Sequence, residues 1–324
     1  MTSAKEGDDF GESGGVRLYP GPVTSRPILL PALALTVTTA VWGSTFFMVK
    51  DIVVFTTPLD FLGVRFAIAA LAIIVLRGRR LLTCSPTTWR RGLSAGAVYA
   101  AAQIAQTYGL KTADASVSGF ITGMYVVLTP VILFLVFRVS TPARVWVATI
   151  LATAGLAVLS LQGFALGTGE ALSFLGAVLY AIHIIVLGRW AGQEKGLDLA
   201  AIQMIAIGAI CGAAALPGGI GLPRGVIPWA EVLYMALISG LLALIVQTWA
   251  QARIPAARAA VIMTTEPVFA ALFAILFGGE SLSGRLLLGG GLVLAAMLLA
   301  ELGPTASPRP ARDGRRGRGA AGER

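Results

Sequence analysis

Long apolar windows separated by short polar connections dominate the chain from about residue 27 to residue 302. A helix needs roughly 20 mostly apolar residues to cross the hydrocarbon core of a bilayer. The pattern predicts ten spans, at 27–49, 58–76, 92–110, 115–137, 144–161, 170–190, 198–216, 230–250, 257–277 and 283–302. The runs are continuous rather than alternating, which favours helices over a membrane β-barrel. We therefore predict an all-α integral membrane protein.

Composition excludes a water-soluble domain. Of the 324 residues, 56% are hydrophobic and only 13% are charged, whereas about a quarter of the residues of a soluble domain carry charge. The connections between the apolar windows are also too short to hold a folded soluble domain. We therefore expect a multi-pass protein that is surrounded by the lipid bilayer.

Both ends of the chain are polar and are expected to be disordered and cytoplasmic. Residues 1–26 mix both signs of charge and lack the short basic leader of a signal peptide, so the first apolar run is predicted to be an uncleaved span. Residues 303–324 are rich in Pro, Gly and Arg, a composition typical of disorder. Attraction to anionic lipid headgroups explains the tail arginines, so no nucleic-acid partner is expected.

Basic residues are distributed unequally between the two sides of the predicted bundle. With ten spans, twenty Lys and Arg residues fall on the side of the termini and four on the other, while Arg65 lies within a span. Cytoplasmic connections of membrane proteins carry the excess of Lys and Arg. Both termini are therefore predicted to be cytoplasmic. The Ala-, Gly- and Arg-rich composition is typical of a GC-rich bacterium, which would place the protein in the inner (plasma) membrane.

Short motifs recur in corresponding spans of the two halves of the chain. Gln106-Thr-Tyr near the end of the third span recurs as Gln247-Thr-Trp near the end of the eighth, and Thr129-Pro recurs as Glu266-Pro. We predict two repeats of five helices, at 27–161 and 170–302. Because five is odd, the second repeat enters the membrane from the opposite side. This is the inverted-topology repeat of many secondary transporters.

These features resemble a known transporter family over the whole membrane region. Its elements are Trp42-Gly-Ser-Thr-Phe46, Arg65, the run from Gly119 to Pro130, Glu266-Pro-Val-Phe-Ala270 and Gly279-Glu280. In their order, spacing and duplication, they resemble the drug/metabolite transporter superfamily in its EamA-type ten-span form. The first repeat departs from it at Phe137-Arg138, where a terminal Gly-Glu often appears. The resemblance implies transport of a small metabolite, without naming that metabolite.

Glu266 lies in an apolar run directly before Pro267. A charged carboxylate at mid-membrane costs several kcal/mol unless it is paired, hydrated or protonated. It could bind a proton or a cationic group, hydrogen-bond to backbone that the proline frees, or face another helix. Because the resemblance implies that this motif occurs in transporters of different substrates, we favour a structural or conformational role.

Other polar and aromatic residues within the spans are candidates for the substrate path, because polar groups at membrane depth usually face protein or water. The candidates for the path, together with Glu266, are Trp42, Thr45, Gln106, Tyr125, Gln247 and Trp249. Each could instead join helices by a hydrogen bond, worth only about 0.6 kcal/mol on average.

In addition to Glu266, two further residues are candidates for binding protons or anions. His183, the single histidine, titrates near neutral pH and could relay a proton, although a hydrogen-bonded packing role is the alternative. Arg65 could hold an anionic group. Pairing with a carbonyl, or snorkelling towards the membrane surface, is the interpretation that we favour for it.

The leading functional hypothesis is a secondary transporter that moves an amino acid-like, nucleoside-like or drug-like metabolite by alternating access. A proton-coupled exporter is one form of it. A channel or facilitator and an intramembrane enzyme are the alternatives, but neither a selectivity filter nor a catalytic constellation is evident. No phosphate-binding loop is present, which excludes ATP-driven pumping by this chain.

The sequence predicts no disulfide, metal or cofactor. Cys84 falls in a cytoplasmic connection and Cys211 in a span, so they cannot meet in an oxidising compartment. A single histidine without a Cys/His cluster gives no metal site. The expected partners are a small-molecule substrate, the lipid bilayer and, as one alternative, a proton. The oligomeric state is open, and a homodimer is one alternative.

Overall fold

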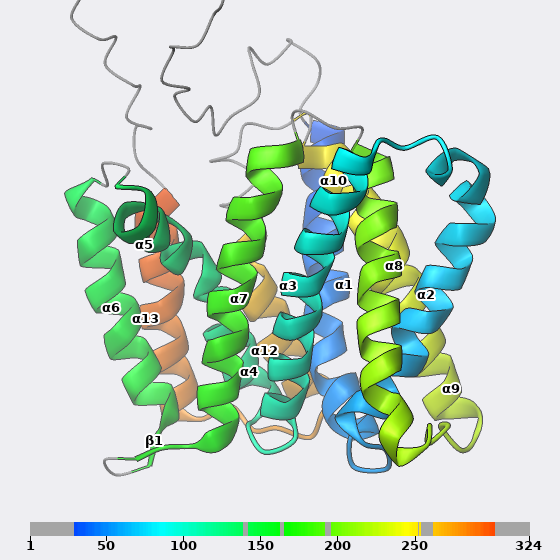
Figure 1. The fold of residues 1–324 in the computed structure, drawn as a ribbon. Coiled ribbons are helices and arrows are strands. Elements are labelled where there is room, and N and C mark those ends of the chain that lie inside the picture. The colour runs from blue at the N-terminus through cyan, green and yellow to red at the C-terminus, as the bar shows by residue number, and fades with distance from the viewer. Residues whose placement is uncertain are drawn as a thin grey trace, which may run out of the picture.

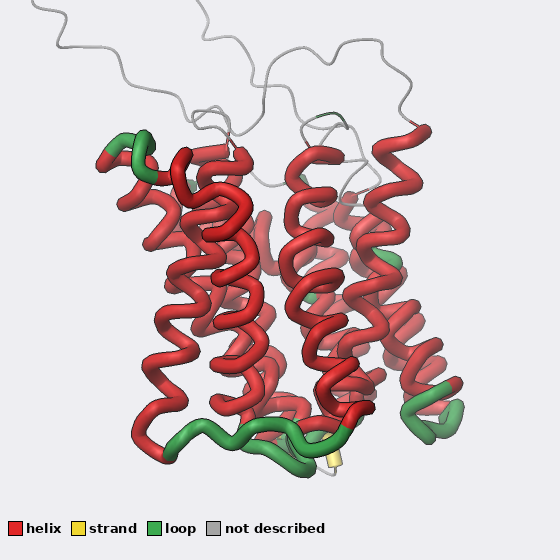
Figure 2. Tube along the Cα trace, turned by 90° about the vertical axis from the view of Figure 1, so that its right-hand side faces the viewer, coloured by secondary structure: helices red, strands yellow, loops and turns green. Residues whose placement is uncertain are grey.

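Long helices lie side by side in a bundle, as Figures 1 and 2 show for this computed structural model. The structure describes residues 29–138, 142–162, 165–191, 196–251, 253 and 262–301. The predicted disordered ends, 1–26 and 303–324, lie outside the described residues. The start of α1 and the end of α13 lie at the same end of the bundle (Figure 1).

The helices follow the predicted windows closely. In the first half they are α1 (Leu29–Ile52), α2 (Pro58–Leu81), α3 (Pro86–Leu110), α4 (Ala115–Gly123), α5 (Tyr125–Phe137) and α6 (Ala143–Ser160). In the second half they are α7 (Thr168–Ala191), α8 (Gly196–Ala215), a 3₁₀ turn (Leu216–Gly218), α9 (Val226–Leu233), η2 (Tyr234–Leu242), α10 (Ala243–Gln251), α12 (Glu266–Leu276) and α13 (Gly284–Glu301). Each predicted window therefore contains a helix.

Three details differ from simple unbroken helices. The window 115–137 holds two helices, because α4 ends at Gly123 and α5 begins at Tyr125. The window 230–250 contains η2, a nine-residue π-helix, between α9 and α10. The connection from α6 to α7 forms a pair of two-residue antiparallel strands, β1 (Leu161–Gln162) and β2 (Ala165–Leu166). This two-residue pair leaves the all-α fold class as predicted.

Among the described residues, six helices are long and apolar enough to cross a membrane, a judgement that rests on length and composition. They are Leu29–Ile52, Pro58–Leu81, Ala115–Val136, Thr168–Leu187, Gly196–Gly218 and Val226–Gln247. Three apolar helices are shorter, at Ala143–Leu159, Glu266–Leu276 and Gly284–Ala300. Large apolar side chains on the outside of the bundle are exposed, among them Val37, Val75, Leu135, Ile150 and Leu287. Such a surface suits hydrocarbon rather than water.

Two helices begin with a capping residue followed by proline. Thr57 precedes α2, and its side-chain oxygen accepts a hydrogen bond from the Asp60 backbone N–H at 3.2 Å. Ser85 precedes α3 and accepts from the Thr88 N–H at 3.1 Å. A first-turn N–H has no partner within its own helix, so such a cap satisfies it and a proline there costs nothing. These local signals explain why the chain turns sharply between spans.

Glycines allow α1, α4 and α12 to pack closely around one axis. A Cβ added at Gly43 would lie 2.6 Å from the Phe269 Cβ, and one at Gly119 would lie 2.6 Å from the Ala270 Cβ. One at Gly123 would lie 2.6 Å from the Pro267 Cγ. Small residues let membrane helices approach in this way. The close approach places the start of α12 against the junction of α4 and α5.

Helices of the two halves pair across the bundle in matching order. The second helix of each half forms one pair (α2 with α8), as do the fifth helices (α6 with α13) and α4 with α12. The third helix of the first half, α3, packs on α7, and its counterpart in the second half, η2 with α10, packs on α1. The interior is therefore built from both halves together.

Candidate functional site

A buried arginine holds the π-helix η2 near the centre of the bundle. Arg65 on α2 is only 5% exposed. Its Nε donates to the Met235 carbonyl oxygen at 3.1 Å, and its Nη2 donates to Ser239 Oγ at 3.5 Å. Its guanidinium carbon lies 4.9 Å from the centroid of the Phe66 ring. The favoured sequence interpretation, pairing with a carbonyl, agrees with this geometry, whereas the side chain does not reach the membrane surface.

Trp42 contacts the same π-helix from α1. Its Nε1 donates to the Ser239 carbonyl oxygen at 3.0 Å. Segments of π-helix occur frequently at functional sites, and this one receives side chains from two helices of the other half. Thr45, the neighbouring path candidate, donates its hydroxyl hydrogen to the Trp42 carbonyl oxygen at 2.7 Å on its own helix. Thr45 therefore adds a local bond rather than a contact between halves.

Aromatic and amide side chains form a hydrogen-bonded chain between α3, α4 and α7. The Tyr180 hydroxyl donates to Gln106 Oε1 at 2.9 Å, and Gln106 Nε2 donates to Thr122 Oγ1 at 3.1 Å. The Tyr99 ring lies edge-on to Tyr180 with centroids 5.4 Å apart, and Gln103 Nε2 donates to the Tyr99 hydroxyl at 3.2 Å. Gln106 thus lies inside a polar network. This position is compatible with both predicted roles, a residue of the substrate path and a contact between helices.

Tyr99 and Tyr180 are half-buried between α3 and α7, with their rings packed edge to face. We define the polar centre as Arg65, Tyr99, Tyr180, Tyr125 and Glu266.

Glu266 is the first residue of α12, and its side chain is buried. The Tyr125 hydroxyl donates to its Oε2 at 3.2 Å. Pro267 occupies the first turn of α12, where its missing N–H interrupts no helical hydrogen bond. The helix break therefore precedes Glu266, at Thr264 and Thr265, and the carboxylate contacts a tyrosine rather than backbone freed by the proline.

His183 is buried and makes a hydrogen bond to an amide. Its Nε2 lies 2.8 Å from Gln203 Oε1, and an amide oxygen can only accept, so Nε2 carries the hydrogen in this arrangement. Its ring lies edge-on to Tyr99 with centroids 5.0 Å apart. The geometry favours the packing role over the proton relay, because the neutral ring already has a partner for its N–H.

Of the two candidates on α10, Trp249 packs against the apolar cluster that contains Tyr125. Its ring also lies 4.7 Å from the guanidinium of the exposed Arg253, near the end of the helix. Gln247 is half-buried two residues earlier. Sequence reasoning missed Tyr99 and Ser239. The spacing of Tyr99, Gln103 and Gln106 on one helical face could have identified Tyr99, but nothing local marks Ser239.

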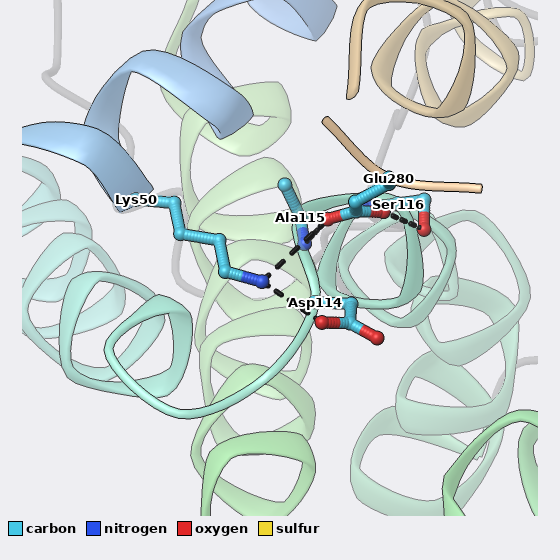
Figure 3. A network of polar contacts seen from close by, with 5 residues as sticks. All are labelled: Lys50, Asp114, Ala115, Ser116 and Glu280. Carbon is cyan, nitrogen blue, oxygen red and sulfur yellow. Dashed lines mark hydrogen bonds and ion pairs between the residues drawn. The ribbon is translucent and has the colours of Figure 1, made fainter. Parts of the chain in front are cut away.

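A second polar cluster, drawn in Figure 3, includes Lys50 in the last turn of α1. Glu280 Oε1 accepts from the Ala115 backbone N–H at 2.6 Å, and Oε2 accepts from the Ser116 N–H at 3.2 Å and from the Ser116 hydroxyl. Lys50 Nζ lies 2.8 Å from Asp114 Oδ1 and 3.6 Å from Glu280 Oε1. We call these five residues the Glu280 clasp. It ties α1, α4 and the segment after α12 together.

The clasp depends on a glycine turn that the first half lacks. Gly279 has a φ of +69°, a conformation that glycine adopts without strain, and it directs Glu280 towards α4. At the corresponding place after α5, Arg138 adopts a left-handed φ of 54° instead. The segments that follow α5 and α12 therefore differ in the residue that adopts the left-handed conformation.

Comparison with known proteins finds the same family twice in this chain. Residues 29–161 and 167–302 each match the profile of the EamA-like transporter family. An uncharacterized transporter of Archaeoglobus fulgidus is 29% identical over 272 residues, which are 83% of this chain and 85% of that protein. The uncharacterized inner membrane transporter YedA of Escherichia coli K12 is 28% identical over 275 residues, covering 81% and 88%. One crystal structure shares the fold, with a TM-score of 0.59 at 17% identity, covering 84% of this chain and 96% of that one.

Proposed function

Because the chain belongs to the EamA-like transporter family, we propose that it is a secondary transporter that moves a small organic solute across the inner membrane by alternating access. The observation that carries this proposal is the polar centre. Its residues come from both halves of an otherwise apolar bundle, and hydrogen bonds of Arg65 and of Glu266 join those halves. Polar groups at membrane depth are costly unless they face protein or a solute path.

The proposal includes ten spans arranged as two inverted repeats. A helix in each of ten windows, the two family matches and the matched pairing of helices between halves support this arrangement. Transporters of this architecture bind solute at the interface of the repeats and rock one bundle against another. Both termini would then be cytoplasmic, in keeping with twenty basic residues on their side against four.

The Glu280 clasp would form the closed end in one state of the cycle. It links segments from the two halves at the end opposite the start of α1, and it consists of hydrogen bonds and an ion pair that can break together. Polar contacts suit a reversible closure, since water can replace each of them when that end opens.

Reconstituted proteoliposomes test the proposed transport. A solute is first chosen with a deletion strain that is grown on amino acids, nucleosides and toxic analogues. Liposomes preloaded with that solute should show saturable counterflow of the labelled compound, and empty liposomes of the same lipid should not. A current that grows linearly with voltage, without saturation by solute, would instead favour a channel.

A further inference from the structure

Arg65 is a buried cation whose charge is not neutralised by a carboxylate. None of the ion pairs within the described ranges includes Arg65. Its hydrogen bonds go to a backbone carbonyl and to the hydroxyl of Ser239. The rings of Phe61 and Phe66 lie 5.8 and 4.9 Å from its guanidinium carbon, and neither carries a charge. Charged residues within a membrane pair with one another or with backbone carbonyls, and Arg65 has a carbonyl but no carboxylate among the described residues.

The guanidinium also retains a free edge. Nε and Nη2 donate to the π-helix η2, while Nη1 donates to no described residue. Tyr99 on α3 and Tyr180 on α7 are half-buried. None of the ion pairs among the described residues joins Arg65 to Glu266, whose Oε2 accepts from the Tyr125 hydroxyl.

We propose that Arg65 binds the carboxylate of the transported solute. A guanidinium offers a planar set of N–H donors that matches the two oxygens of a carboxylate, which a point charge such as lysine does not. The tyrosines would add a hydroxyl and an apolar ring face beside the solute. This inference rests on the proposed transport function and narrows its substrates to solutes that carry a carboxylate.

Thermal unfolding of the purified full-length protein in lipid nanodiscs tests the site without a known substrate. The probes are acetate, phenylacetate and phenyllactate, each paired with its amide. A ligand that binds the folded state raises the melting temperature with its concentration. At least one carboxylate should give a saturable rise that its amide does not. Sodium chloride at equal ionic strength should give none, since chloride cannot use the planar fork.

Variants assign the response to the arginine. Arg65→Gln should weaken the carboxylate response about tenfold or more, because it removes a charge-assisted hydrogen bond. Arg77→Gln is the matched control, since Arg77 is another arginine of α2 that pairs with Asp198 at the end of that helix. It should keep the wild-type response. If Arg65→Gln does not fold, Arg65→Lys keeps the charge without the fork and should bind the carboxylate more weakly than the wild type.

Several results would overturn the assignment. These are a wild-type protein that no probe carboxylate stabilises beyond its amide, an equal response to chloride, and an undiminished response in Arg65→Gln or Arg65→Lys. Counterflow of a neutral or cationic solute without any carboxylate response would reject this site and leave the transport function standing. Carboxylate binding without counterflow would support this site and reject the transport function.

Discussion

At the scale of single residues, the contacts of Glu266 bear on its role. Glu266 begins α12 with its carboxylate against the Tyr125 hydroxyl. A carboxylate there can hold a helix start in place, because the positive end of the helix dipole favours negative charge. The contact joins α5 to α12, and therefore one half of the chain to the other. This supports a structural or conformational role.

Substitutions at Glu266 distinguish a structural role from a role that needs the charge of the carboxylate. We expect Glu266→Gln to keep most solute exchange, because an amide oxygen still accepts from Tyr125. Glu266→Ala should lose about 1 kcal/mol of stability, since it removes the hydrogen bond that the carboxylate accepts from Tyr125. Tyr125→Phe removes the same hydrogen bond by deleting its donor. Exchange and melting in nanodiscs measure both effects. Equal and complete loss in Gln and Ala, with normal membrane insertion, would show that the charge is essential.

His183 provides a second test at this scale. In the structure it packs against Tyr99 and bonds to Gln203. We therefore expect His183→Gln, which places an amide N–H near the position of Nε2, to leave the pH dependence of uptake unchanged. Uptake is measured in proteoliposomes across pH 5.5 to 8, the range that spans the usual imidazole titration. Loss of the pH dependence in this variant would favour the relay.

At the scale of elements, the Glu280 clasp fixes how α4 begins. Asp114 precedes α4 but makes no side-chain cap hydrogen bond, so Glu280 from a distant segment satisfies the first N–H groups instead. Asp114 itself is 67% exposed at the side chain. A surface ion pair of this kind contributes only about 0–1 kcal/mol, whereas a helix cap contributes about 0.5–2 kcal/mol.

These magnitudes predict an order of effects. Glu280→Ala should destabilise the protein most, Glu280→Gln less because one oxygen remains, and Asp114→Asn least. Melting temperatures in nanodiscs measure the order. If the clasp also closes this end of the path, Glu280→Ala should speed the labelling of a cysteine placed at the buried Ser118. Comparable stability of Glu280→Ala and Asp114→Asn would contradict the capping role.

At the scale of the whole molecule, the proposed ten spans predict on which side of the membrane each connection lies. Reporter fusions at Thr83, between α2 and α3, and after Arg324 should both report cytoplasm, because the termini side carries the basic residues. A fusion at Gly221, between α8 and α9, is the control and should report the opposite side. A fusion at Thr83 that reports the periplasm would reject the ten-span arrangement.

Cysteine labelling tests which side chains face the path. In a background without Cys84 and Cys211, cysteines at 106 and 247 should react with small polar thiol reagents faster than one at 125, because Gln106 and Gln247 are half-buried and Tyr125 is buried. Transported solute should slow this labelling. A cysteine at Val147, exposed on the outside of α6, should stay unreactive since lipid covers it. Inert cysteines at 106, 125 and 247 would favour interhelical contacts instead.

The sequence by itself determined the class of protein, the positions of the helices and the family. These follow from the hydrocarbon core of the bilayer. Each span must be long and apolar enough to cross it, and must satisfy its backbone hydrogen bonds within its own helix. Local signals such as Thr57-Pro58 and Ser85-Pro86 also mark helix starts without tertiary information. The repeated motifs predicted a division into halves, and the family profile matches residues 29–161 and 167–302.

Only the tertiary structure decided which side chains meet. Arg65 bonds to Ser239, Tyr125 to Glu266, and Glu280 to the start of α4, each across more than a hundred residues. No local pattern encodes such pairs, because each depends on how closely two helices pack and how they are rotated. Glycines such as Gly43 set that approach through backbone contact. The contact of Arg65 with Ser239 therefore follows from packing rather than from composition or spacing.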